Sequence, residues 1–155
     1  MEKKILIKNI LISFLPVLIV AVLGSVFTSL GMEWFNALNK PSEWLPNYII
    51  PIVWSVIYLL ASIILFIWNC NGGIPKGVNW LFAVNGLLNI FWCLSFFTLN
   101  QLFFGLVLIL FNVVCASFLI IQIDKYRPQY SRFLLIYPIW LYIATTLNIA
   151  VWVLN

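Results

Sequence analysis

The stretch from Gly77 to Ile123 reads GVNWLFAVNGLLNIFWCLSFFTLNQLFFGLVLILFNVVCASFLIIQI and contains no charged side chain. A helix that crosses the roughly 30 Å hydrocarbon core of a bilayer needs about 20 apolar residues, so this run is too long for one crossing and fits two. The polar step Thr98-Leu99-Asn100-Gln101 is the natural break between them. The stretch therefore predicts two transmembrane helices, at about 78–98 and 102–123.

Three more uncharged stretches cover residues 9–32, 44–75 and 133–155, and charged residues make up 8% of the chain against about 25% in soluble proteins. The first run is longer than the apolar core of a signal peptide, so we interpret it as a retained span. The sequence predicts an all-α integral membrane bundle of five transmembrane helices in a single domain, 1–155. The remaining spans are expected at about 9–30, 48–69 and 133–154, with a first loop at 31–47.

Basic residues are distributed unevenly between the two sides of this predicted topology. The N-terminus and the loops after the second and fourth spans hold seven of the eight, and the opposite side holds Lys40. Because positive charge concentrates on the cytoplasmic side, we expect a cytoplasmic N-terminus, with the first loop and the C-terminus outside. The same bias accounts for the net charge of +4, so no nucleic-acid partner is expected.

Groups that perform acid–base or metal chemistry are scarce. The chain has no histidine, and its three cysteines are scattered without a paired motif, so we predict no metal site and no required cofactor. An ion pathway usually shows an ionisable residue within the membrane, and none lies within a predicted span. Ordinary acid–base and nucleophilic catalysis are disfavoured for the same reason. The acidic residues lie in loops or at span ends: Glu2, Glu33, Glu43 and Asp124.

Polar and aromatic side chains share helix faces inside three spans. An asparagine in a membrane helix often bonds a neighbouring helix, and tryptophan often lies at the membrane interface. Trp54, Trp92 and Trp140 lie several residues inside their spans, however, where a buried indole N–H needs a partner. These faces favour an aromatic cavity for a flat apolar ligand. Its predicted ligand-binding residues are Trp54, Tyr58, Asn85, Asn89, Trp92, Phe96, Trp140, Ala144 and Asn148.

The first loop is long and rich in aromatic residues and prolines, which is not typical of a flexible linker. One interpretation is a lid over the outer mouth of the bundle. The other is an ordinary interfacial loop whose aromatic residues lie among lipid headgroups. The predicted lid residues are Trp34, Lys40, Pro41 and Trp44.

Three blocks resemble the translocator protein, or tryptophan-rich sensory protein, family, formerly the peripheral benzodiazepine receptor family. The first is Trp34-Phe35-x2-Leu38-x-Lys40-Pro41-Ser42, followed by Pro46, Pro51, Val53-Trp54 and Tyr58. The second is Leu88-Asn89-x2-Trp92-x3-Phe96-Phe97. The third is Trp140-x3-Ala144-x2-Leu147-Asn148-x3-Trp152-x2-Asn155. Together they cover nearly the whole chain in order.

The resemblance implies a five-helix bundle, usually a homodimer, with a cavity beneath the first loop. The ligands it implies are porphyrins and related tetrapyrroles, and the role is tetrapyrrole sensing or handling. One alternative is a light-dependent porphyrin-degrading enzyme. In that case Trp54 and Trp140 are the candidate oxidisable residues, although no catalytic residue is assigned. Another alternative is a small transporter subunit or a structural protein.

The chain departs from the family pattern at two places. Glu43 stands where the family has a tryptophan, with Trp44 one step late, so the lid and the ligand preference are expected to differ. The Pro-Tyr pair that opens the family's fifth helix is here Tyr137-Pro138, which moves the proline. In the fourth span the small residues Gly105, Ala116 and Ser117 suggest a place for close contact in a dimer.

Overall fold

The computed structural model describes residues 3–41, 46 and 48–155, and every regular element in these residues is a helix. Five segments are long and apolar enough to cross a membrane, which confirms the predicted fold class. The elements are α1 (Lys3–Leu30), α2 (Met32–Ala37), α3 (Ile49–Cys70), α4 (Lys76–Cys93), the π-helix η1 (Leu94–Thr98), α5 (Leu102–Tyr126), α6 (Pro128–Leu134) and α7 (Ile136–Leu154).

Two spans begin earlier than the uncharged stretches suggest. α1 starts at Lys3 where the prediction began at residue 9, and the last span starts at Pro128 as α6 and continues as α7. A gap in charge marks the hydrocarbon region, whereas helical hydrogen bonding continues into the interface, where lysine and arginine extend their charged ends toward water. The α5–α6 junction follows the rule that proline is accepted in the first turn of a helix.

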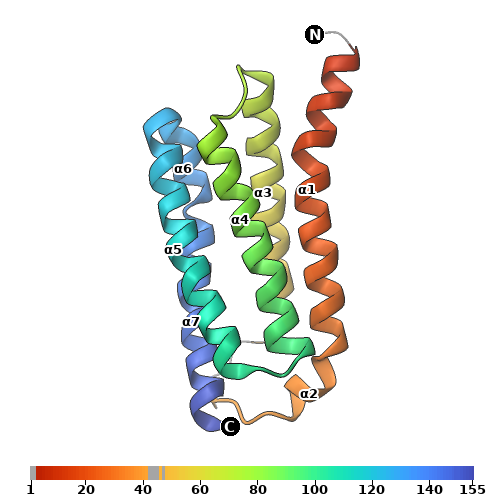
Figure 1. Cartoon of the computed structure of the whole chain (residues 1–155), viewed down its shortest axis with the longest axis vertical. Helices are drawn as coiled ribbons and strands as arrows, with labels where there is room; N and C mark the ends of the chain where they lie inside the picture. The colour runs from red at the N-terminus through yellow and green to blue at the C-terminus, as the bar shows by residue number, and fades with distance from the viewer. Residues whose placement is uncertain (1–2, 42–45, 47) are drawn as a thin grey trace.

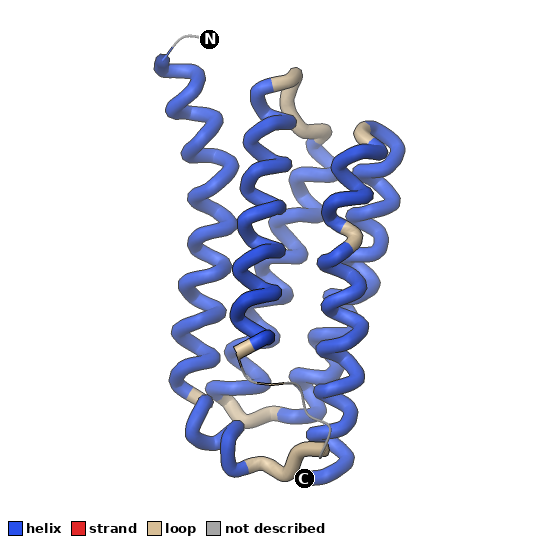
Figure 2. Tube along the Cα trace, turned by 180° about the vertical axis from the view of Figure 1, so that it is seen from behind, coloured by secondary structure: helices blue, strands red, loops and turns tan. Residues whose placement is uncertain are grey.

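The long helices run along one axis and form a bundle with two distinct ends (Figures 1 and 2). The N-terminal end holds the start of α1, the α3–α4 turn and the α5–α6 connection. The α2 end holds α2, the connection from η1 to α5 and the C-terminus. Helix α1 packs against α3 and α4, α4 packs against α5, and α5 packs against α6 and α7, while α3 meets α6 and α7 through fewer residues.

Two connections between spans form where backbone chemistry favours them. In the α3–α4 turn Gly72 and Gly73 have φ of 104° and 82°, a region that glycine enters without steric cost. The break between the two spans of 77–123 lies at the predicted place, with Asn100 at φ 56° between η1 and α5. The π-helix before it was not predicted. It leaves the Ser95 carbonyl free to accept from the Gln101 N–H at 2.9 Å.

Glycine brings α1 close to its neighbours toward the α2 end. A Cβ on Gly31 would lie 2.0 Å from the Phe97 carbonyl oxygen, and a Cβ on Gly86 would lie 2.9 Å from Cγ2 of Val20. Toward the N-terminal end of the bundle, α1 and α4 diverge (Figure 1). This divergence decides where the bundle is filled and where it is hollow.

Large apolar side chains cover the outer surface of the bundle, as lipid contact requires. Phe111 is 63% exposed and Val153 is 70% exposed. Gly105 and Ala116 are instead buried, and Gly105 packs against the Phe96 ring. The suggestion that these two small residues form a dimer contact is therefore wrong, because they mediate packing within one bundle.

Candidate functional site

An aromatic pocket lies near the α2 end, between α2, α3, α4, η1 and α7. The Trp92 ring stacks on the Phe96 ring with centroids 5.8 Å apart, and the Trp54 ring lies 6.4 Å from the Trp92 ring. Six predicted ligand-binding residues line this pocket, together with four others. The lining is Phe35, Ile50, Trp54, Trp92, Phe96, Phe97, Trp140, Ala144, Leu147 and Asn148.

Hydrogen bonding in the pocket leaves one indole without a partner. Trp92 Nε1 donates to Asn148 Oδ1 at 3.2 Å, and Asn148 Nδ2 donates to the Ala144 carbonyl at 2.9 Å. Trp140 Nε1 is buried and has no hydrogen-bond partner among the residues that the structure describes. Because buried polar groups are nearly always satisfied, this donor is available to a bound molecule.

The aromatic pocket is almost filled by the protein's own side chains. Its free volume is about 40 Å³, whereas sites for small molecules measure roughly 300–1,000 Å³. The Phe35 ring of α2 covers it and lies 6.0 Å from the Phe96 ring and 5.2 Å from the Phe97 ring. Any sizeable ligand therefore requires Phe35, and α2 with it, to move outward.

The predicted lid residues that the structure describes lie around α2. The Trp34 ring meets the Phe96 ring edge-on at 6.2 Å. Lys40 Nζ lies 4.6 Å above the centroid of the Phe35 ring and donates to the carbonyls of Asn36 and Leu38 at 3.3 and 3.4 Å. Partial burial lowers the pKa of the Lys40 ammonium. Pro41 follows, and Trp44 lies outside the described residues.

The segment after α2 is tied to the C-terminus. The Asn39 backbone N–H donates to Asn155 Oδ1 at 3.0 Å, and Asn155 Nδ2 donates back to the Asn39 carbonyl at 3.0 Å. Both bonds are exposed, so each contributes little to stability and is readily exchanged for water. The segment that follows α2 is therefore joined to the C-terminus by exposed, weak contacts.

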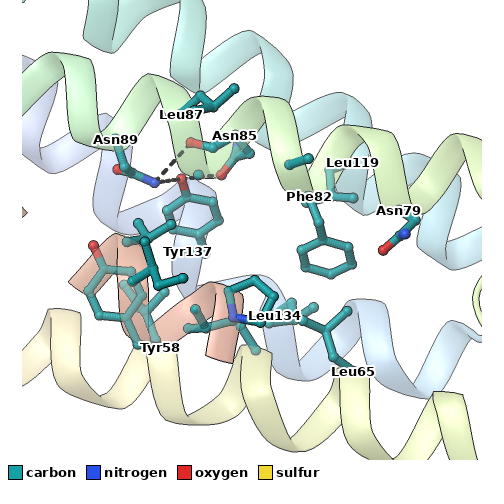
Figure 3. A pocket seen from close by; sticks show the side chains of 18 of the residues that line it. Tyr58, Leu65, Asn79, Phe82, Asn85, Leu87, Asn89, Leu119, Leu134 and Tyr137 are labelled. Atoms are coloured by element: carbon teal, nitrogen blue, oxygen red, sulfur yellow. Dashed lines mark hydrogen bonds between the residues drawn. The ribbon is translucent and has the colours of Figure 1, made fainter. Parts of the chain in front are cut away.

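A polar network crosses the middle of the bundle beside the aromatic pocket (Figure 3). The Tyr137 hydroxyl accepts from Asn89 Nδ2 at 2.7 Å and donates to Asn85 Oδ1. Asn112 Nδ2 donates to Asn89 Oδ1 at 3.0 Å. Three helices are thereby joined by uncharged groups, as expected where hydrocarbon offers no competing water.

Sequence reasoning left Tyr137 out of the site. It lies three residues before Trp140, so one more helical step along the same face would have included it. Its ring meets the Trp54 ring edge-on at 6.1 Å on one side and lines a second cavity on the other. Tyr137 and its network thus separate two spaces that the sequence predicted as one.

The second space is a large cavity of about 510 Å³ toward the N-terminal end. The other three predicted ligand-binding residues, Tyr58, Asn85 and Asn89, line this cavity (Figure 3). All six α-helices other than α2 contribute to its wall, and most of the wall is apolar. The predicted residues are therefore divided between a filled aromatic pocket and a hollow, largely aliphatic cavity.

Comparison with known proteins matches residues 12–153 to the TspO/MBR family model. The tryptophan-rich protein TspO of Archaeoglobus fulgidus is 30% identical over 151 residues, which cover 96% of this chain and 98% of that protein. The tryptophan-rich protein TspO of Bacillus cereus is 31% identical over 134 residues, covering 85% and 87%. The human translocator protein is 30% identical over 129 residues, covering 79% and 75%.

Proposed function

This chain belongs to the TspO/MBR family, and we propose that it binds flat hydrophobic molecules of the tetrapyrrole class in the aromatic pocket. The carrying observation is the unpartnered Trp140 Nε1–H in a wall of indole and phenyl rings. The rings offer apolar faces to a planar molecule, and the indole N–H offers a hydrogen bond to an oxygen at its edge. The resulting role is tetrapyrrole sensing or handling in a membrane.

Entry of such a ligand requires the pocket to open. We propose that α2 and the following residues act as the lid, with Phe35 leaving the pocket as the ligand enters. Besides its contact with the Phe35 ring, Lys40 near the pocket mouth would then bind the ligand, because its ammonium pairs with a carboxylate at the edge of a porphyrin. The lid proposal includes Trp34 and Pro41.

A porphyrin titration tests the proposal. Detergent-purified protein is titrated with protoporphyrin while tryptophan fluorescence is recorded, and we expect saturable quenching. Trp140→Phe removes the unpartnered donor and keeps an aromatic ring, so the dissociation constant should rise about fivefold to tenfold. The matched control is Trp80→Phe, because Trp80 is 71% exposed and lies on α4 near the N-terminal end. Non-saturable quenching, or equal effects of the two variants, would contradict the proposal.

Illumination of the same samples distinguishes binding from degradation. The closeness of Trp54 to Trp92 favours degradation as a second candidate function, because excited porphyrin would lie against oxidisable indoles. A binding protein should leave the rate of porphyrin bleaching near that in detergent alone. A degrading enzyme should accelerate bleaching in wild type and lose this acceleration in Trp140→Phe, when both proteins are compared at porphyrin concentrations that saturate the weaker-binding variant.

The proposal keeps two further expectations from the sequence. One is a homodimer, and the other is a cytoplasmic N-terminal end with the α2 end outside. Crosslinking in native membranes tests the first expectation. Reporter fusions at each terminus test the second, and a periplasmic signal from an N-terminal reporter would reverse the assigned orientation.

A further inference from the structure

The large cavity has the features of a ligand site distinct from the aromatic pocket. Its volume of about 510 Å³ falls within the roughly 300–1,000 Å³ typical of small-molecule sites, without any rearrangement. On α3 its lining runs from Ile57 to Asn69, about 18 Å at 1.5 Å per residue. A sphere of the same volume would be little more than half as long. The cavity is therefore elongated along the bundle.

The mouth of the cavity opens sideways between α1 and α4. Ile12 and Ile19 of α1 line the cavity, and yet they are 47% and 48% exposed. Leu87 of α4 lines it and is 53% exposed, and Ala83 one turn away is also exposed. These residues lie within membrane-spanning segments, so the mouth faces lipid. An occupant enters from the bilayer.

Polarity in the lining restricts the chemistry of the occupant. None of the described residues that line the cavity is a lysine, arginine, aspartate or glutamate, so a charged group would have no partner among them. At the inner end of the cavity, which is the end beside Tyr137, the Asn85 side chain is 4% exposed and its Oδ1 accepts from the Tyr137 hydroxyl. Its Nδ2 has no hydrogen-bond partner among the described residues. At the opposite end Asn69 Nδ2 already donates to Ser13 Oγ at 2.9 Å. The unmet hydrogen bond is thus a donor at the inner end.

We propose that the large cavity binds an uncharged, hydrocarbon-tailed carbonyl compound drawn from the bilayer. Its carbonyl oxygen accepts from Asn85 Nδ2 beside Tyr137, and its tail follows the aliphatic wall toward the N-terminal end. This site and its ligand are independent of the tetrapyrrole proposal, because the residues that line the large cavity and those that line the aromatic pocket do not overlap.

Photo-crosslinking with paired probes tests the site in the full-length protein. One probe is a long-chain methyl ketone with a diazirine in its tail, and the other is the matched alkane. Peptide mass spectrometry should place the ketone label on the lining of α1, α3 and α4. Ketone labelling should exceed alkane labelling by about tenfold, since one hydrogen bond to a buried donor distinguishes the probes. Labels spread over the outer lipid-facing surface would overturn the proposal.

Two variants distinguish a real site from general lipid contact. Asn85→Leu should make the amount of labelling by the ketone equal to that by the alkane. Continued labelling by the alkane would show that the cavity is still present. Ala83→Trp should block the mouth and abolish labelling by both, whereas Val84→Trp, on the adjacent lipid-facing position outside the lining, should not. An unchanged preference for ketone in Asn85→Leu would refute the assigned donor. Displacement of the ketone by protoporphyrin would instead place the tetrapyrrole in this cavity and overturn the proposal.

Discussion

The two halves of this bundle are both apolar inside, but one is lined mainly by aromatic rings and the other mainly by aliphatic side chains, and they pack in opposite ways. At the α2 end, aromatic rings fill the interior and leave about 40 Å³, while the N-terminal end leaves about 510 Å³. The tryptophan-rich half is thus the closed half. Aromatic composition therefore indicates where a ligand would find contacts, but the spacing of the helices decides where space exists.

Glycine placement explains the difference. Gly31 sits against the Phe97 backbone and Gly86 sits against Val20, so α1 approaches η1 and α4 closely in the α2 half. Toward the N-terminal end, where the cavity lies, α1 and α4 diverge (Figure 1).

Gly31→Ala should destabilise the bundle most. The new Cβ would meet the Phe97 carbonyl oxygen at 2.0 Å, and a backbone atom cannot rotate away, so we expect a loss of about 3 kcal/mol or more. Thermal unfolding in detergent, followed by circular dichroism, measures this. The control is Gly77→Ala, whose Cβ would meet nothing within 4 Å. Similar unfolding temperatures for the two variants would remove the proposed role of Gly31.

The same enlargement in each half should give different results. Ala144→Leu adds volume to the filled aromatic pocket and should cost about 1–3 kcal/mol of stability, since overpacked cores must shift. Ala61→Leu extends into the large cavity and should change stability by less than about 0.5 kcal/mol. Unfolding curves of the two variants measure the contrast. If Ala61→Leu proved the more destabilising, the N-terminal half would not be hollow in solution.

Tyr137→Phe should destabilise the polar network that separates the aromatic pocket from the large cavity. Removal of the hydroxyl leaves Asn85 Oδ1 without its donor and Asn89 Nδ2 without one of its acceptors, for about 1–2 kcal/mol. Tyr142→Phe on the same helix is the control, because Tyr142 is 57% exposed. Calorimetry of both variants provides the comparison. Equal stabilities would mean that the network contributes nothing beyond packing.

Lys40→Met should give the smallest effect, confined to α2. The substitution keeps the chain length but removes the charge over the Phe35 ring, a contact that contributes about 0.5–1 kcal/mol at an exposed position. Amide hydrogen exchange in α2 should become about twofold to fivefold faster, with α5 unchanged. Lys76→Met, at the start of α4, serves as the control. An unchanged rate of amide hydrogen exchange in α2 would show that Lys40 does not stabilise the lid.

Much of this architecture was predictable because hydrophobicity along the chain is a local property. The break near Asn100, the Gly72-Gly73 turn and the five spans all follow from runs and interruptions in the sequence. Shared helix faces also grouped Asn85 with Asn89, and Trp140 with Ala144. Tyr137 lies on the same helix face as Trp140, so periodicity could have included it in the site. Its bonds to Asn85 and Asn89 depend on how α7 packs against α4, which helical periodicity does not reveal.

The amino-acid sequence alone predicts the lipid environment, the positions of the helices and the scarcity of acid–base groups. Each of these depends only on the types of residues and their order along the chain. Tertiary structure alone decided that the predicted site is two spaces, that the Trp140 and Asn85 donors are left unpartnered, and that Tyr137 stands between them. These outcomes depend on the distances between helices. Such distances are set by contacts like those of Gly31 and Gly86, between residues far apart in the chain.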